Sequence, residues 1–163
     1  RKVFFPRLLL PLGVIPSLLL DLACATALMF VLMAIYGIPL HWGLALFPLA
    51  ILILSGMALG LGMIAGSLAG NYRDIQYILP LVLQLLMFAS PVGYSAKAVP
   101  DYILPFYQLN PLVAPLETIR WSFIGVGQPN LGGMLYALAC SVALLATGLA
   151  VFRLTERKFA DVI

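Results

Sequence analysis

Very few side chains in this sequence are suited to acid–base or nucleophilic chemistry. The 163 residues include six Asp or Glu, one histidine and two cysteines. The sequence has no HExxH zinc motif, no GxSxG nucleophile motif and no useful grouping of carboxylates. Cys24 and Cys140 lie inside apolar runs, where buried free thiols are the ordinary expectation, and His41 stands alone in a short turn, where we expect it to be solvated. We therefore predict no catalytic site and no metal site.

One pair of charged residues is spaced for an interaction. Glu117 and Arg120 are three residues apart in a predicted short helix, so their side chains can form an ion pair. The surrounding segment is also rich in aromatic residues, namely Tyr94, Tyr102, Phe106, Tyr107, Trp121 and Phe123. Such rings can form a belt at a membrane interface or stack on sugar rings, and composition alone favours the belt.

A run of glycines recurs within one apolar stretch, at Gly56, Gly60, Gly62, Gly66 and Gly70. A nucleotide-binding glycine loop needs a strand before it and a helix after it, and this run lies inside a continuous apolar segment. Small residues four apart instead let helix backbones approach closely in lipid. We assign Gly56, Gly60, Gly62 and Gly66 to helix packing, within the chain or between copies.

The composition identifies the solvent in which these residues are placed. The chain is 63% hydrophobic and 9% charged, whereas a soluble domain carries about 25% charged residues. No soluble core of this size could bury so much apolar surface. The net charge of +3 is small and scattered, so nucleic acid is not an expected partner. We predict an all-α integral membrane protein with membrane lipid around it.

Four segments are apolar enough to cross a bilayer, which takes about 20 residues in a helix. They cover residues 17–36, 43–70, 75–93 and 132–152, within a single transmembrane domain. Lys and Arg mark the cytoplasmic side. With four spans, seven of them lie on the side of both chain ends, and only Lys97 and Arg120 lie on the other. We therefore expect both ends in the cytoplasm.

The segment 100–125 is then placed on the outer side, between the third and fourth spans. Prolines divide it into two short helices, about residues 101–109 and 115–124, with Glu117 in the first turn of the second. Each would be about 14–15 Å long, and neither could cross a hydrocarbon core of about 30 Å. The pair could form a re-entrant lid over a sheltered passage or a simple interfacial anchor, and the residues alone leave both open.

Several stretches together resemble a known family. They are "KVFFPRLLLPL" at 2–12, "NYRDIQYILPLVLQLLMFASPVGY" at 71–94, "LNPLVAPLETIRWSFIG" at 109–125 and "ERKFADVI" at 156–163. The chain resembles the membrane permease of type-2 ATP-binding-cassette exporters, in particular those that export O-antigen, capsule or teichoic-acid polysaccharides across the bacterial inner membrane. The four spans would match the last four of an expected six, so the chain would be incomplete at its N-terminus.

The resemblance implies a homodimer of permeases with two copies of a cytosolic ABC ATPase. ATP and Mg would bind the ATPase, this chain would hold no cofactor and would not be an enzyme, and the substrate would be a lipid-linked glycan. Segment 1–16 would be cytoplasmic or interfacial and 153–163 a cytoplasmic tail. The implied ATPase-coupling residues are Phe5, Pro6, Arg7, Tyr72, Arg73 and Asp74. The implied outer gate and glycan path consists of Tyr94, Tyr102, Tyr107, Glu117, Arg120 and Trp121.

Two other functions remain open at this point. A drug or lipid exporter permease of the same superfamily would have a smaller apolar pocket in place of a wide path lined by aromatic rings. A membrane scaffold subunit without transport activity would form no stable complex with an ATPase.

Overall fold

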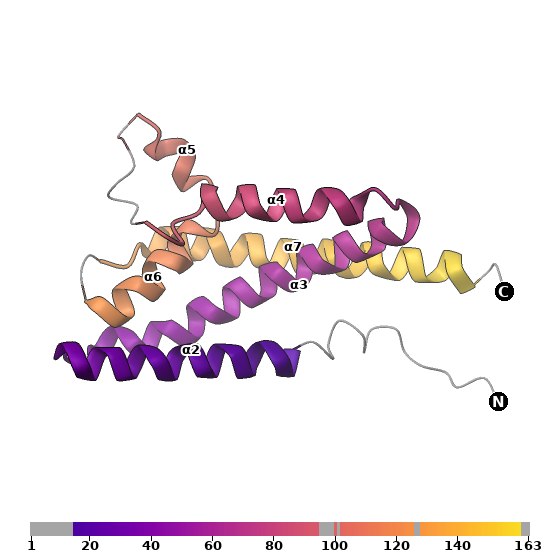
Figure 1. Ribbon diagram of the computed structural model, residues 1–163. Coiled ribbons are helices and arrows are strands. Elements are labelled where there is room, and N and C mark those ends of the chain that lie inside the picture. Colours follow the sequence, from indigo (N-terminus) through magenta and orange to yellow (C-terminus); the bar gives the residue numbers. More distant parts are fainter. Residues whose placement is uncertain (1–14, 95–99, 101, 126–127, 161–163) are drawn as a thin grey trace. The chain divides into compact units, whose positions relative to one another are not determined.

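The computed structural model describes residues 15–94, 100, 102–125 and 128–160. Within these ranges the chain is helical and has no strand, which confirms the all-α prediction. The elements are α2 (Ile15–Tyr36), the 3-10 helix η1 (Trp42–Leu46), α3 (Phe47–Asn71), α4 (Ile75–Ala89), α5 (Leu104–Gln108), α6 (Val113–Ile124) and α7 (Leu131–Ala160) (Figure 1). The chain divides into two compact units, residues 1–40 and 41–163.

The first unit contains one long helix, α2, which matches the predicted span 17–36. Gly37 ends it in the left-handed conformation, with φ of 65°. The Gly37 N–H donates to the Ala34 carbonyl at 3.4 Å, and the Ile38 N–H donates to the Met33 carbonyl at 2.9 Å. This pair of hydrogen bonds satisfies the last carbonyls of a helix, and glycine adopts the required conformation without a steric penalty.

Three helical segments in the described residues are long and apolar enough to cross a membrane: Pro16–Tyr36, Trp42–Gly70 and Leu131–Thr155. They correspond to the predicted spans 17–36, 43–70 and 132–152. Helix α7 continues to Ala160, through most of the segment 153–163 that we expected to be a tail.

The predicted span 75–93 is shorter than expected. Helix α4 has 15 residues and ends at Ala89, so it is about 22 Å long against a hydrocarbon core of about 30 Å. Pro91 is the reason, because a proline disfavours the helical conformation at the residue before it. Ser90 is accordingly extended, with φ of −116° and ψ of 150°.

The core of the second unit lies between α3 and α7, which pack against each other (Figure 1). Ala50, Ile53 and Met57 of α3 and Met134 and Ala137 of α7 form its buried cluster. Farther along, the two backbones touch. A Cβ atom added to Gly60 would lie 2.6 Å from the Leu144 carbonyl oxygen, and one added to Gly148 would lie 2.6 Å from the Gly60 carbonyl oxygen. Any larger residue at these positions would separate the helices.

The glycines of α3 therefore divide into two groups. Gly56 faces Ser141, whose hydroxyl donates to the Ile53 carbonyl at 3.0 Å, and Gly60 faces the α7 backbone. A Cβ atom added to Gly62 or Gly66 would meet no described atom within 4 Å, so the contact with α7 does not use these two glycines. Among the described residues, Gly56 and Gly60 pack against α7, whereas Gly62 and Gly66 have no such contact.

This difference between glycines gives a matched pair of substitutions. Gly60→Ala should lower the free energy of unfolding in mild detergent by about 1–3 kcal/mol, because the methyl group overpacks a backbone contact. Gly62→Ala should leave it unchanged or raise it by about 0.5–1 kcal/mol, because alanine favours the helix. Denaturation of the two purified variants measures both values. Equal losses of stability would contradict the assignment of Gly60 to the α3–α7 contact.

Candidate functional site

The segment between α4 and α7 contains the two short helices that the sequence predicts, with different bounds. Helix α5 has only five residues, and α6 has 12. Helix α6 begins at Val113, two residues before Pro115, so Glu117 lies in its second turn and our placement of Glu117 in the first turn is wrong. Gly125 ends α6 in the left-handed conformation, with φ of 73°. Both helices are too short to cross a bilayer.

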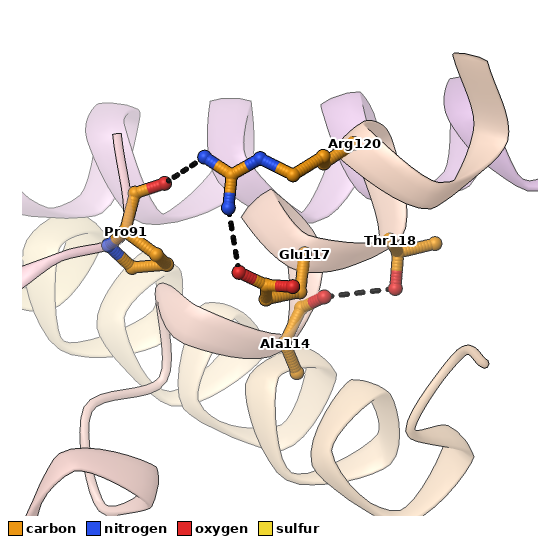
Figure 2. Close-up of polar contacts among 5 residues, drawn as sticks. All are labelled: Pro91, Ala114, Glu117, Thr118 and Arg120. Carbon is orange, nitrogen blue, oxygen red and sulfur yellow. Dashed lines mark hydrogen bonds and ion pairs between the residues drawn. The ribbon is translucent and has the colours of Figure 1, made fainter. Parts of the chain in front are cut away.

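An arginine links α6 to the end of α4 (Figure 2). Arg120 Nη1 donates to Glu117 Oε1 at 2.7 Å, and Nη2 donates to the Pro91 carbonyl at 3.0 Å. The ion pair confirms the spacing argument. The second contact spans 29 residues and has no signal in the sequence. The side chains of Arg120 and Glu117 are 26% and 33% exposed, so water still screens part of the pair.

Asn110 makes a second link between the same elements. Its Nδ2 donates to the Ala89 carbonyl at 3.1 Å and to Ser90 Oγ at 3.0 Å, and its Oδ1 accepts from the Leu112 N–H at 3.0 Å. The Asn110 amide therefore uses both its donor and its acceptor. The donor binds groups at the end of α4, and the acceptor stabilises the turn into α6. The Tyr136 hydroxyl on α7 donates to the Leu109 carbonyl at 3.0 Å beside this turn.

Trp121 fixes the other end of α6 against η1. Its side chain is only 5% exposed. The rings of His41 and Trp42 meet it at centroid distances of 4.9 and 5.1 Å, both nearly perpendicular. His41 Nδ1 accepts the Gly43 N–H at 3.1 Å, and a Cβ atom on Gly43 would lie 2.6 Å from the Trp121 ring. His41 is thus part of an aromatic cluster and is half-buried, so our expectation of an isolated histidine is wrong, although part of the ring remains exposed.

The aromatic residues of the segment differ widely in exposure. Tyr102 and Phe106 are 78% and 77% exposed, whereas Trp121 and Phe123 are buried. Phe123 packs on Phe47 at the start of α3, with ring centroids 5.1 Å apart. A sugar ring could reach Tyr102 directly, but the Trp121 ring is already covered by protein. Helix α6 therefore packs against α3, η1 and α7, whereas α5 contacts mainly α6 (Figure 1).

Tyr107 on α5 is buried, and its hydroxyl has no hydrogen-bond partner of acceptable geometry among the described residues. Its ring lies 6.2 Å from that of Tyr94, whose hydroxyl donates to the Phe88 carbonyl at 2.9 Å. Burial, followed by the nearby Tyr94 side chain and Glu117, raises the pKa of Tyr107 well above the usual range. The hydroxyl stays neutral and remains available as a hydrogen-bond donor.

The turn between α3 and α4 holds three of the residues expected to couple to an ATPase. Tyr72, Arg73 and Asp74 are all exposed. The Tyr72 N–H donates to the Leu68 carbonyl at 2.8 Å, and the Asp74 carbonyl accepts from the N–H groups of residues 77 and 78. Their backbone is therefore fixed by the two helices while the side chains are free to contact another protein. Phe5, Pro6 and Arg7 lie outside the described residues.

Comparison with known proteins shows a consistent set of similarities. The sequence matches the family described as ABC-2 type transporter over residues 10–124. It is 30% identical to the O-antigen export system permease protein RfbA of Myxococcus xanthus, over 99% of this chain and 63% of that protein. It is 23% identical to a protein of the same name from Klebsiella pneumoniae, over 100% of this chain and 63% of that protein.

A further similarity is to the capsule polysaccharide export inner-membrane protein CtrC of Neisseria meningitidis. The identity is 27%, over 82% of this chain and 52% of that protein. The chain therefore spans less than two thirds of the length of these relatives. The family match covers α2 to α6, including the whole α5–α6 segment.

The contacts of Arg120 lead to a prediction about the attachment of α6. Arg120→Gln should lower the free energy of unfolding by roughly 1–2 kcal/mol and speed amide exchange in α6, because both the Glu117 and Pro91 contacts are lost. Glu117→Gln leaves the Pro91 contact in place, so its effect should stay below about 1 kcal/mol. Hydrogen exchange followed by mass spectrometry measures both variants. No loss of stability and no faster exchange in Arg120→Gln would contradict the role of the Pro91 contact.

The unpartnered hydroxyl of Tyr107 predicts an unusual response to substitution. Tyr107→Phe should leave stability unchanged or raise it, because no hydrogen bond is lost. Tyr94→Phe, the matched control, should lower it by about 0.5–1.5 kcal/mol through loss of the Phe88 contact. Thermal denaturation in detergent compares them. A clear loss of stability in Tyr107→Phe would mean that the hydroxyl has a partner after all.

The same variant has a distinct alkaline behaviour. The pKa of Tyr107 is higher in the folded chain than in the unfolded chain. Above about pH 10 the unfolded chain releases a proton that the folded chain retains, so the free energy of unfolding falls as the pH rises. Below about pH 10 this loss of stability is absent. Tyr107→Phe should therefore lose less stability than the wild type above about pH 10, as measured by denaturation at a series of pH values.

Proposed function

Because the chain belongs to the ABC-2 type transporter family and forms a multi-pass membrane protein, we propose that it is the transmembrane part of an exporter that moves a lipid-linked polysaccharide across the bacterial inner membrane. The observation that carries the proposal is the similarity over essentially the whole chain to permeases named for O-antigen export, together with one named for capsule polysaccharide export. A drug or lipid exporter has no comparable support among these relatives.

The energy for export would come from a separate protein. The described residues show no group of His, Cys, Asp and Glu that could hold a metal, and the motifs of the chain suggest no site for ATP. We propose two copies of a cytosolic ABC ATPase, which bind ATP and Mg, on a homodimer of the permease. The chain itself would be a non-enzymatic subunit.

The orientation follows from charge. Lys and Arg concentrate at both chain ends, and the α3–α4 turn carries Arg73, which supports a cytoplasmic location for these parts. The exposed Tyr72, Arg73 and Asp74 would then face the ATPase. We include Phe5, Pro6 and Arg7 in the same coupling surface. The α5–α6 segment, at the opposite end of α4, would face the outside.

The proposed gate consists of the α5–α6 segment over the outer end of the passage. Arg120, Asn110 and Trp121 hold α6 to α4 and η1, so closure does not depend on α5 alone. Export requires a second arrangement in which nucleotide-driven movement of the helices separates the gate from its partners. The ring of Tyr102 is exposed, so it would be accessible to a sugar as the sugar leaves.

The function is tested in cells that carry the gene. Deleting it should abolish the surface polysaccharide and restoring it should recover the polymer. The tagged full-length permease should also copurify with an ABC ATPase in mild detergent, because the two subunits form one transporter. Tyr72, Arg73 and Asp74 together changed to Ala should weaken this copurification, whereas Leu61→Ala, on an exposed side of α3, should not. Unaltered surface polysaccharide and no associated ATPase would reject the proposal.

A further inference from the structure

One face of α4 differs from the rest of the helix. Gln76, Pro80 and Gln84 recur at intervals of four residues, and Tyr77 and Phe88 lie beside them. A helix advances 3.6 residues per turn, so these five residues share about one third of its circumference, and the flexible Met87 lies among them. The opposite side carries only aliphatic residues, among them Ile78, Val82, Leu85 and Ala89.

The polar groups on this face are open within the described structure. Helix α4 has no buried residue, Tyr77 is 82% exposed and Phe88 is 64% exposed. Gln76 and Gln84 are exposed too, and neither side chain has a hydrogen-bond partner among the described residues. Pro80 leaves the Gln76 carbonyl, one turn earlier, without its helical hydrogen bond, because proline has no N–H to donate.

Lipid is a poor neighbour for such a face. An amide or carbonyl in hydrocarbon loses its hydrogen bonds to water and gains none. Polar side chains inside membrane segments therefore face other protein or a water-filled cavity, and unsatisfied backbone groups do the same. The aliphatic side of α4 suits lipid, so the two sides of the helix have different neighbours.

The size of the residues separates the two remaining possibilities. Close helix contacts in this chain use small residues, as at Gly60, Gly148 and Ser141. The face formed by Gln76, Tyr77, Pro80, Gln84 and Phe88 has no glycine, alanine or serine, so it lacks the small residues that allow the close backbone contact between α3 and α7. A wide, hydrated passage accommodates these side chains better than a helix–helix interface does.

The face is also continuous with the gate. It begins beside Arg73 in the α3–α4 turn and ends at Phe88, whose carbonyl accepts the Tyr94 hydroxyl. Two residues beyond α4, Pro91 accepts the hydrogen bond from Arg120. The polar face therefore extends along the whole helix from the proposed coupling turn to the proposed outer gate.

We propose that this face of α4 lines the export path and binds the hydroxyl groups of the passing polysaccharide, with Gln76 and Gln84 as its hydrogen-bonding residues. The proposal rests on the export function above and adds residues and a binding chemistry to it. A neutral amide both donates and accepts, as a sugar hydroxyl does, so it can exchange partners along a chain of similar units. The rings of Tyr77 and Phe88 supply flat apolar surfaces for the sugar C–H faces. Separate weak sites allow movement, whereas one tight site would hold the polymer.

Solvent access is tested with single cysteines in the full-length permease, after Cys24, Cys140 and any cysteine elsewhere in the full-length protein are replaced by serine. Gln76→Cys and Gln84→Cys are paired with Ile78→Cys and Val82→Cys, at similar depths on the aliphatic side. A charged thiosulfonate reagent is applied to open membrane fragments, so that both sides are accessible. Cysteines at 76 and 84 should react about tenfold faster or more, because the reactive thiolate forms in water and is suppressed in hydrocarbon.

Export is the second readout, measured as the rate at which new polysaccharide reaches the cell surface. Gln84→Leu and Gln76→Leu should each slow export by about 2- to 10-fold, the effect of losing one neutral hydrogen bond. Gln84→Asn, which retains an amide, should recover part of the rate. Val82→Leu serves as the control and should export at the wild-type rate.

Two results would overturn the proposal. One is equal, slow labelling on both sides of α4. The other is a disulfide that links two permease copies through Gln84→Cys, together with wild-type export in Gln84→Leu. That second result would make the face a protein interface. Labelling does not depend on export. If no ATPase copurifies but cysteines at 76 and 84 are labelled rapidly, the exporter function is rejected while the hydrated face of α4 remains. The failures of the two proposals are therefore distinguishable.

Discussion

The backbone contact between α3 and α7 is the constraint on which the rest of the second unit depends. Gly60 and Gly148 bring the two long helices together without side chains between them, and the Ser141–Ile53 hydrogen bond fixes their register. In lipid, where burial of apolar surface does not drive helices together, this close packing has to supply the association. Residues around the α6 start, Leu112 and Ala114 among them, then pack against the resulting core.

The end of α4 holds the start of α6 and the turn before it in place. Pro91 stops the helix after 15 residues. The Ala89 carbonyl and the Ser90 hydroxyl then accept from Asn110, and the Pro91 carbonyl accepts from Arg120. The short helix thus creates the acceptors that hold α6 in place. Early termination of α4 and attachment of α6 are consequences of the same proline.

The proposed exporter uses these features in different ways. Helix α6 is covered by protein on several sides, whereas Tyr102 and Phe106 are exposed in and just before α5, and α4 exposes an entire polar face. Exposed polar groups in a segment of membrane depth imply water or another polar neighbour. Rigid attachment of α6 and open surfaces on α4 and α5 are compatible with a path that is closed at one end and hydrated along its length.

The sequence alone determined the solvent, the helices and the local ion pair. Apolar composition required a bilayer, runs of about 20 apolar residues located the long helices, and Glu117 and Arg120 could be paired because a helix brings residues three apart together. The tertiary structure decided which of the repeated glycines are used, why Trp121 is buried and where the second donor of Arg120 is bound. Those outcomes depend on contacts between residues tens of positions apart, and neither periodicity nor composition records which distant segment a side chain will meet.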